Sequence, residues 1–479
     1  HTLNGDEKYN TGKFGEIRLG GVENKPAHDF GVTYRRRNWT FFGASRQSQT
    51  IEPYGNGNNP YTYGDYRTFE GSGPGLGMAH QHLGAKYNAD IGDGWGFEFN
   101  PYFDRTQIQA TLAANNGSGN AFGWQDQNLG FIAQANRDYE TSFGSGALLF
   151  GAQVDAFTVT DRMVTGHANG EITAPTDNKG TRLLDIGGEE IYSFFFQDKH
   201  KFNSEWIVNF GGRYDSQTRK GGGKYQKLSP RVALIYLPNA TYEFKLSYSQ
   251  SFVDAPYWYR FNRGLAAFGG SEFLNPEVLD ALQFQTVWKS NDKRLRNAAT
   301  FFYQNGTNLI VNRATAAGTP ADPKYINSGK IESGGLENEF SWQEKSYQIF
   351  WNLQYSQAIN AIDFAKFDSK FAHVPQVMTN LNANYSVTPE IGVNASLQYI
   401  GEQAYNSGTL AAPVETKVDA ATLIHLGARY ENIASSGLFV DARVYNLLGT
   451  EWYQGGQSGT QIPFRQTGRW YFVSLGREF

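Results

Sequence analysis

Two histidines, His80 and His82, stand two positions apart and are the residues of this sequence whose type and spacing first suggest metal chemistry. Side chains at positions i and i+2 of an extended segment point to the same side, so these imidazoles could hold a metal ion or a haem iron. The same pattern fits two exposed loop histidines that bind nothing. We treat both residues as candidate ligand-binding residues, and we expect no resident metal ion and no cofactor.

A second candidate site is an aromatic and cationic cluster between residues 257 and 263. Guanidinium groups stack on aromatic rings and pair with oxygen anions, so such a surface suits planar, anionic ferric chelates. The alternative is an ordinary aromatic girdle with loop packing. The candidate substrate-binding residues of this cluster are Tyr257, Trp258, Tyr259, Arg260 and Arg263.

The motifs of the common enzyme classes are missing from this sequence. It contains no GxSxG nucleophile elbow, no HExxH zinc pair and no GxxxxGK[ST] phosphate loop. It also has no cysteine, which excludes thiol catalysis, thiolate metal sites and disulfides. We therefore expect a protein that is not an enzyme.

The composition favours strands over helices. Aromatic residues make up 15% of the 479 residues, and there are 54 glycines but only 3 methionines. The formal net charge is −4 and no basic stripe dominates any region, so we expect no nucleic-acid partner. No apolar run approaches the roughly 18 residues that a membrane helix needs. A membrane strand needs no such run, because only one of its two sides faces lipid.

Strict alternation of apolar and polar residues is the strongest structural signal. In residues 391–399 every second residue is apolar, and residues 380–387 alternate in the same way just before the short link Thr388-Pro389-Glu390. This arrangement predicts a hairpin with one apolar face and one polar face. The same alternation recurs in residues 206–215, 242–249, 347–355 and 438–444.

The connections between the predicted strands are short at one end and long at the other. Short links lie at Asn203-Ser204 and at residues 238–240, whereas the long ones cover about residues 48–79, 161–189 and 403–420. We therefore predict an all-β fold, a transmembrane antiparallel β-barrel of about 22 strands with short periplasmic turns and long extracellular loops. The alternative is a soluble sandwich or propeller, whose strands also alternate.

The end of the chain is similar to a known family. Residues 440–449 read VDARVYNLLG and residues 468–479 read GRWYFVSLGREF. This resembles the last two strands of TonB-dependent outer-membrane receptors, in which an Asn-Leu turn and a Gly-Arg pair precede a terminal Phe. The resemblance implies that Phe479 is read by the barrel-assembly machinery. Leu448 and Gly449 depart from the Phe-Asp pair that is commoner in the family.

Further motifs follow in the family's order over most of the chain from about Gly130. The stretches SPRVALIYLPNATYEFKLSYSQSFVDAP from Ser229 and FLNPEVLDALQFQ from Phe273 resemble its Ser-Pro-Arg, Phe-Arg-Ala-Pro and Asn-Pro segments. Some haem-transporting members carry a histidine between the last two of these segments, and residues 257–274 contain none. The matching positions are Phe252, Ala255, Pro256, Asn275, Pro276, Tyr325, Asn327, Gly335 and Glu337.

The front of the chain departs from the family pattern. Family members place a plug domain and a TonB-contacting box before the barrel, whereas alternation here begins by Phe14. We therefore expect one β-barrel domain over residues 1–479, without plug or TonB box. Charges predicted to face the lumen either solvate an open channel or hold a plug, and both readings remain open; these are Arg18, Arg213, Arg231, Asp441 and Arg443.

The resemblance implies a TonB-dependent receptor in the bacterial outer membrane that imports a scarce nutrient. We expect an iron–siderophore or related iron chelate, with haem as an alternative substrate. A different class of function is a plugless barrel that acts as a passive channel or as a structural scaffold for a partner protein or lipoprotein. The implied partners are outer-membrane lipid and lipopolysaccharide, the barrel-assembly machinery, and the TonB complex where a plug is present.

Overall fold

The computed structural model describes most of the chain. These are residues 7–10, 16–19, 28–51, 75–113, 118–168, 171–172, 184–185, 187–221, 223–262, 271–313, 315–408, 412–454 and 464–477. Arg263 and Phe479, which carried predicted roles, lie outside them. Arg18 lies in β2 (Glu16–Leu19), but its side chain lies outside the described part.

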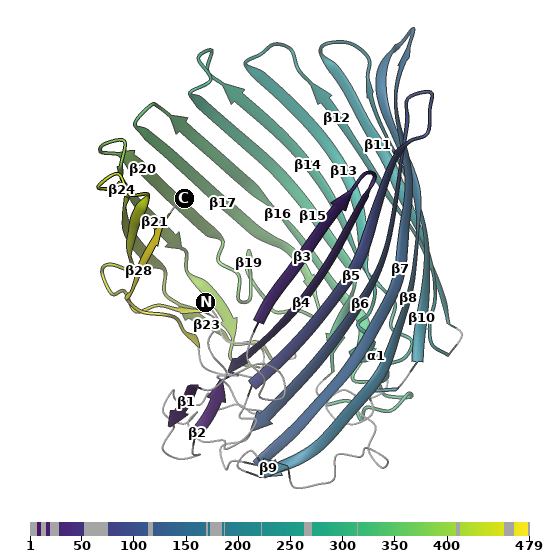
Figure 1. Ribbon diagram of the computed structural model, residues 1–479. Coiled ribbons are helices and arrows are strands. Elements are labelled where there is room, and N and C mark those ends of the chain that lie inside the picture. Colours follow the sequence, from purple (N-terminus) through teal and green to yellow (C-terminus); the bar gives the residue numbers. More distant parts are fainter. Residues whose placement is uncertain are drawn as a thin grey trace.

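Long antiparallel strands form nearly the whole structure (Figure 1). The first group is β3 (His28–Arg36), β4 (Trp39–Ile51), β5 (Gly75–Asp90), β6 (Trp95–Ala113), β7 (Ser118–Thr141), β8 (Gly144–Ala168) and β10 (Gly187–Lys201). The second group is β11 (Trp206–Thr218), β12 (Lys224–Tyr236), β13 (Tyr242–Val253), β14 (Glu277–Lys289), β15 (Leu295–Asn312), β16 (Tyr325–Gln343) and β17 (Tyr347–Ile362). The last group is β20 (Val377–Ser386), β21 (Ile391–Ile400), β24 (Ala421–Ile433), β25 (Leu438–Tyr445) and β28 (Trp470–Arg477).

Short elements occupy the connections between these strands. They are β9 (Glu171–Ile172), α1 (Tyr257–Phe261), β18 (Lys366–Phe367), β19 (Lys370–Phe371), β22 (Gln403–Asn406), β23 (Glu415–Val418), β26 (Tyr453–Gln454) and β27 (Phe464–Arg465). Near the start of the chain, β1 (Glu7–Asn10) pairs with β2. Among the described residues, none of the helices is both long and apolar enough to cross a membrane.

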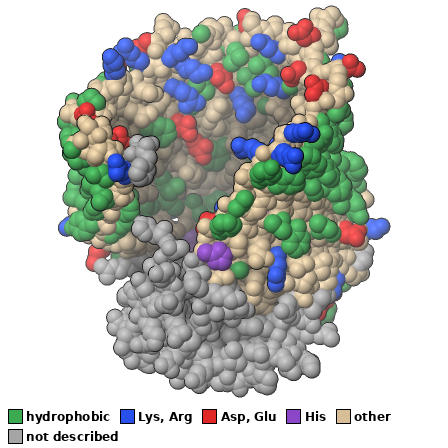
Figure 2. Space-filling view, in the orientation of Figure 1, with side chains coloured by type: hydrophobic (Ala, Val, Ile, Leu, Met, Phe, Trp, Pro, Cys, Tyr) green, Lys and Arg blue, Asp and Glu red, His purple; other side chains and the backbone are tan. Residues whose placement is uncertain are grey.

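Each long strand pairs antiparallel with the next long strand along the chain, from β3 to β28. The resulting sheet curves around a hollow interior, as Figures 1 and 2 show. The largest sheet holds 20 strands, of which β9 has two residues. The predicted all-β, antiparallel architecture is therefore confirmed, with 20 strands in the described sheet where about 22 were expected. Among the described residues, no register joins β3 directly to β28.

The two faces of the sheet differ as the alternation predicted. In β11, Trp206, Phe210 and Tyr214 are exposed on the outer face, whereas Asp215 on the inner face is 5% exposed. In β13 the outer residues Tyr242 and Leu246 are likewise exposed. Figure 2 shows hydrophobic side chains over the outer surface and charged side chains around the hollow. An apolar outside and a polar inside are the reverse of a water-soluble fold.

Side chains that bond to nearby backbone N–H groups build the short turns. The Asn203 side-chain oxygen accepts hydrogen bonds from the N–H groups of Glu205 and Trp206. The Asn239 side-chain oxygen likewise accepts from the N–H groups of Thr241 and Tyr242. The Thr388 hydroxyl accepts from the N–H groups two and three residues further on. Asn and Thr hold turns in this way because their oxygens replace a missing ladder partner. The predicted short links are thereby explained.

The long connections differ from the prediction in their boundaries. β4 runs to Ile51 and β5 begins at Gly75, so the strands take up both ends of the segment predicted as a loop over residues 48–79. β8 likewise continues to Ala168, and residues 403–420 contain the hairpin β22–β23. Backbone pairing continues beyond the apolar part of each strand, because hydrogen bonds in the ladder do not require apolar side chains. Alternation alone therefore underestimates strand length.

Buried apolar residues gather near the long connections. Val159 and Leu184 form one such cluster, with Trp124, Phe157 and Trp258 packed against it. Ala255, Leu274 and Tyr325 form another. These clusters bring α1 and the segment before β14 against the strands. The wall is a single sheet, so its apolar packing is concentrated where connections fold back onto it.

Candidate functional site

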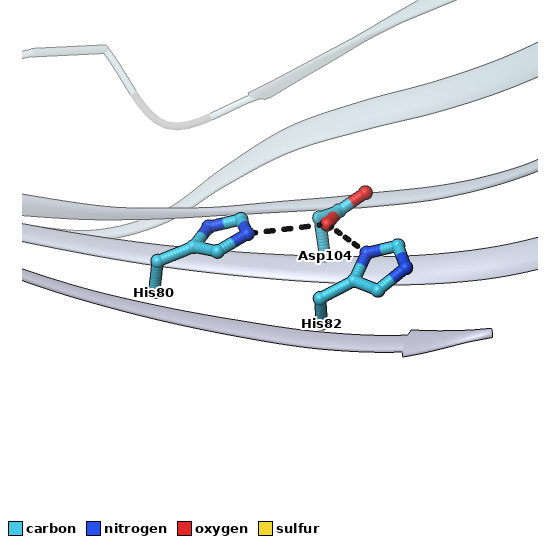
Figure 3. A group of neighbouring side chains, drawn as sticks. All are labelled: His80, His82 and Asp104. Carbon is cyan, nitrogen blue, oxygen red and sulfur yellow. Dashed lines mark hydrogen bonds and ion pairs between the residues drawn. The ribbon is translucent and has the colours of Figure 1, made fainter. Parts of the chain in front are cut away.

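His80 and His82 lie on the inner face of β5, beside Asp104 of β6 (Figure 3). The His82 Nδ1 atom is 2.6 Å from the Asp104 Oδ1 atom, and the His80 Nε2 atom is 3.5 Å from the same oxygen. One metal-ligating atom from each residue can be chosen so that all three lie within 4.8 Å of one another. The structure thus places the two predicted histidines together and adds a carboxylate.

The strand pattern explains why these three side chains share a face. Leu83, which directly follows His82 in β5, is 61% exposed on the outer face and pairs with Phe103 of β6. His82 pairs with Asp104 and His80 pairs with Thr106, so their side chains point to the opposite side, into the interior. The Phe42 ring stacks on His82, with ring centroids 5.2 Å apart. This contact holds the His82 imidazole in one plane.

Arg260 of α1 is buried at 1% exposure and is bound on all sides by the protein. Its guanidinium donates to Glu189 at 2.5 and 2.8 Å and to Asp254 at 3.3 Å, and its Nε donates to the Ala255 carbonyl. Arg219 also pairs with Asp254. The cation predicted to meet an anionic ligand therefore meets two carboxylates of the protein. A side chain buried in this way offers no surface to a ligand.

The aromatic residues of α1 also make contacts within the protein. The Tyr257 hydroxyl donates to the Asp185 carbonyl at 2.6 Å. Trp258 packs against Trp124, with ring centroids 4.8 Å apart. Tyr259 stacks on Tyr325 at 4.3 Å, and Tyr325 is one of the positions that matched the family. In this structure the cluster anchors α1 to the wall, as the packing alternative describes. Tyr257, Trp258 and Tyr259 are half-buried, and ligand binding by them stays a prediction.

The predicted inner-face charges are mostly paired along the wall. Arg213 donates to Asp215 at 2.8 Å and to the Ser193 hydroxyl at 2.7 Å. Arg443 makes two bonds of 2.8 Å to Asp441. Arg231 donates to the Gln197 side chain at 2.6 Å. Paired charges of this kind keep the inner face hydrated without leaving a strong field of one sign.

Two cavities of about 290 Å³ each lie against the wall formed by β17, β20, β21, β24 and β25. They share Asn384, Asn394 and Arg443. A further cavity of about 250 Å³ lies between the β18–β19 connection and β14 to β17, with Gln283, Gln304 and Gln354 in its lining. Amides and a guanidinium are groups that hold polar ligands or a polar protein surface. The inner wall can therefore bind a hydrophilic partner.

Sequence reasoning missed the acidic partners of both candidate sites, Asp104, Glu189 and Asp254. Glu189 lies 71 positions from Arg260 and Asp104 lies 22 positions from His82, and strand registers bring these partners together. Asp254 lies only six positions from Arg260, on the segment between β13 and α1. The one signal in the sequence was the short turn between β5 and β6, where Asp90 pairs with Gly96. The register set there continues to the pair of His82 and Asp104.

The fold and the inner wall define a large antiparallel β-sheet with the apolar outer face and polar inner face of a membrane β-barrel. The sequence matches the family described as TonB dependent receptor-like, beta-barrel over residues 5–447, and the chain belongs to this family. Receptors of this family are transporters, so the chain is not an enzyme. No curated protein matches the chain in sequence.

Three solved structures illustrate the shared fold. The siderophore receptor PirA from Acinetobacter baumannii has a TM-score of 0.73 at 16% identity, covering 98% of this chain and 72% of that one. Pseudomonas aeruginosa FpvA, bound to heterologous pyoverdines, gives 0.71 at 13% identity, with 97% and 65% covered. The ferric enterobactin receptor PfeA from Pseudomonas aeruginosa, in complex with enterobactin, gives 0.70 at 15%, with 98% and 72% covered. At these identities the likeness establishes the fold alone.

Proposed function

We propose that this chain forms the barrel of an outer-membrane receptor that imports an iron chelate with energy supplied through TonB. The observation that carries the proposal is the family match over residues 5–447 on a sheet with an apolar outside and a polar, cavity-bearing inside. The similar structures named above are receptors for siderophores. They are longer than the part that this chain matches, so the activity of the whole receptor belongs to the proposal.

A hydrophilic wall suits a receptor that moves a polar ligand past a plug. The cavities at Asn384, Asn394 and Arg443 offer donors and acceptors to a polar surface, whereas the exposed residues of the outer face are mainly apolar and aromatic. An iron chelate carried by such a receptor crosses the membrane along a water-lined path, because a charged ligand is not soluble in hydrocarbon. This function requires a location in the outer membrane. Its partners are the barrel-assembly machinery and the TonB complex.

Uptake in cells tests the proposal. A Gram-negative strain that lacks its own receptors for a panel of ferric siderophores and haem is given the full gene, and accumulation of radioactive iron is measured with each chelate. The expected result is uptake of at least one chelate that stops when TonB is deleted. Uptake that continues without TonB, together with steady conductance in planar bilayers, would instead identify a passive channel. Absence of both uptake and conductance would favour the scaffold function.

A further inference from the structure

We propose that His80, His82 and Asp104 form a binding site for a first-row divalent transition-metal ion on the inner wall. Imidazole nitrogen is a donor that zinc, copper, nickel and iron prefer, and a carboxylate supplies the negative charge. The three residues come from two adjacent strands, so backbone hydrogen bonds fix their spacing. The site would bind metal whether or not the chain imports an iron chelate.

The distances fit one ion. Zinc binds imidazole nitrogen and carboxylate oxygen at about 2.0 to 2.2 Å, so the donors of one ion lie roughly 3 to 4 Å apart. Here the three donor atoms lie within 4.8 Å of one another. Small rotations about the side-chain bonds bring them to the ion, without movement of the strands. Binding replaces the contact between His82 Nδ1 and Asp104 Oδ1 with bonds from both side chains to the ion.

Groups outside the triad orient the two imidazoles. His80 Nδ1 lies 3.4 Å from the Thr106 hydroxyl, so the ring can present Nε2 to the ion while its other nitrogen meets an oxygen. Phe42 covers one face of the His82 ring. Metal-bound histidines characteristically have such a partner on the second nitrogen, and it fixes the ring orientation. The neighbouring strand adds Asp126, which pairs with Thr106 and increases the negative charge of the surroundings.

Three protein donors leave coordination positions open toward the interior. The side chains of His80, His82 and Asp104 are 37%, 28% and 27% exposed, so water or a small ligand can reach the ion. A fully ligated structural site would be closed, whereas sites that exchange ligands keep an open position. The same imidazole–metal chemistry accepts a free ion or a metal already held in a chelate with vacant positions. Two probes distinguish these sources.

The test uses the full, untagged chain in detergent micelles. Zn²⁺ alone and Ni²⁺–nitrilotriacetate are each titrated by calorimetry into the original protein and into His80→Ala, His82→Ala and Asp104→Asn. His28→Ala is the matched control, because His28 lies on β3 beside Asp29 and its ring contacts the Ser45 hydroxyl. Heat-modifiable electrophoretic mobility shows that each variant is folded.

The expected result is one Zn²⁺ bound per chain, with unchanged binding in His28→Ala and much weaker binding in each of the three site variants. Thr106→Val, which removes only the second contact of His80, should weaken binding by about tenfold. Binding of Ni²⁺–nitrilotriacetate by the same residues would assign the site to chelated metal as well. Equal Zn²⁺ binding in His80→Ala, His82→Ala and the original protein would overturn the proposal.

A spectroscopic measurement keeps the proposal open to refutation if a variant fails to fold. Cu²⁺ is added to the unaltered protein at one equivalent, and its electron paramagnetic resonance spectrum is recorded. Two imidazole ligands produce a nitrogen splitting pattern, and this should become simpler in His80→Ala. A spectrum without nitrogen splitting in the unaltered protein would exclude coordination by the two histidines. These readouts are independent of iron uptake, so failure of this site and failure of the proposed import function are distinguishable.

Discussion

Arg260 and Glu189 are joined by two hydrogen bonds of 2.5 and 2.8 Å, and their side chains are only 2% and 6% exposed. Gln217 and Asp254 complete the surroundings, with the Gln217 amide donating to both carboxylates. This ion pair connects α1 to the start of β10. It is the most deeply buried ion pair among the described residues, and it fixes where the connection between β13 and β14 lies on the wall.

Replacement of Arg260 by Ala should therefore destabilise the protein. The change leaves Glu189 buried without its counter-charge, which costs about 3 to 5 kcal/mol of unfolding free energy. Unfolding of the refolded protein in lipid vesicles, followed by tryptophan fluorescence in urea, measures the loss. The control is Arg294→Ala, since Arg294 pairs with Glu344 at a 55% exposed position and should leave the midpoint unchanged. Similar midpoints for the two variants would contradict the structural role of Arg260.

Gly335 of β16 is a position where a side chain has no room. A Cβ atom there would collide with the backbone carbonyl of Tyr355 on β17 and with the Phe302 ring. Backbone cannot move aside as a side-chain tip can, so Gly335→Ala should destabilise by about 1 to 3 kcal/mol. Gly392→Ala is the matched control in β21, because nothing lies within 4 Å of its Cβ position. Equal unfolding midpoints would show that the two strands are not as close as described.

Much of the fold could be predicted because its rules are local. Alternation in residues 391–399 identifies a strand, and β21 is Ile391–Ile400. The turns at Asn203 and Thr388 depend on side chains that bond to N–H groups two or three residues away. Strand ends were less accurate, because ladder hydrogen bonds continue where the apolar pattern has stopped. The periodic signal reports contact with the apolar surroundings and not the length of the ladder.

The sites could be predicted only in part, because they depend on register. His80 and His82 share a side at any register, so their proximity follows from spacing. Asp104 joins them only when β5 and β6 pair as they do. For Arg260 the residue type indicated an anion partner, but nothing local distinguished a ligand from Glu189. Chemistry that binds an external anion and chemistry that holds α1 in place look the same in sequence.

The connection that contains β18 and β19 should respond to pH through Glu402. Hydrogen bonds from Lys370 and then Lys417 hold the pKa of the Glu402 carboxyl below its ordinary value, and Glu402 in turn raises the pKa of Lys370. The stabilisation by Glu402 is therefore complete above the ordinary glutamate pKa of about 4.3 and is lost as the pH falls through the lowered value. The stabilisation by Lys370 is complete below the ordinary lysine pKa of about 10.4 and is lost only as the pH rises through the raised pKa.

Limited proteolysis at pH 7 and at pH 3.5 measures this effect. An acid-tolerant protease should cut residues 363–376 faster at the lower pH, relative to a reference cut elsewhere in the chain. Glu402→Gln should raise the rate at pH 7 and remove most of the difference between the two conditions. Thr388→Ala, in a short turn at the opposite end of the strands, serves as the control variant. An unchanged pH response in Glu402→Gln would assign the effect to another group.

The final prediction concerns which side of the sheet meets lipid. Leu246 is 48% exposed on the outer face of β13, in a row with Leu234 and Phe284, whereas the next residue, Ser247, faces the interior beside Gln283. An arginine in the hydrocarbon region costs about 2 to 4 kcal/mol, but an arginine in a hydrated interior costs little. Leu246→Arg should therefore reduce the yield of folded, heat-modifiable protein in vesicles far more than Ser247→Arg does. Since the two positions are adjacent, they share strand, depth and local backbone, and only their face differs. Equal yields would mean that water bathes both faces and that the apolar row is not in contact with a membrane.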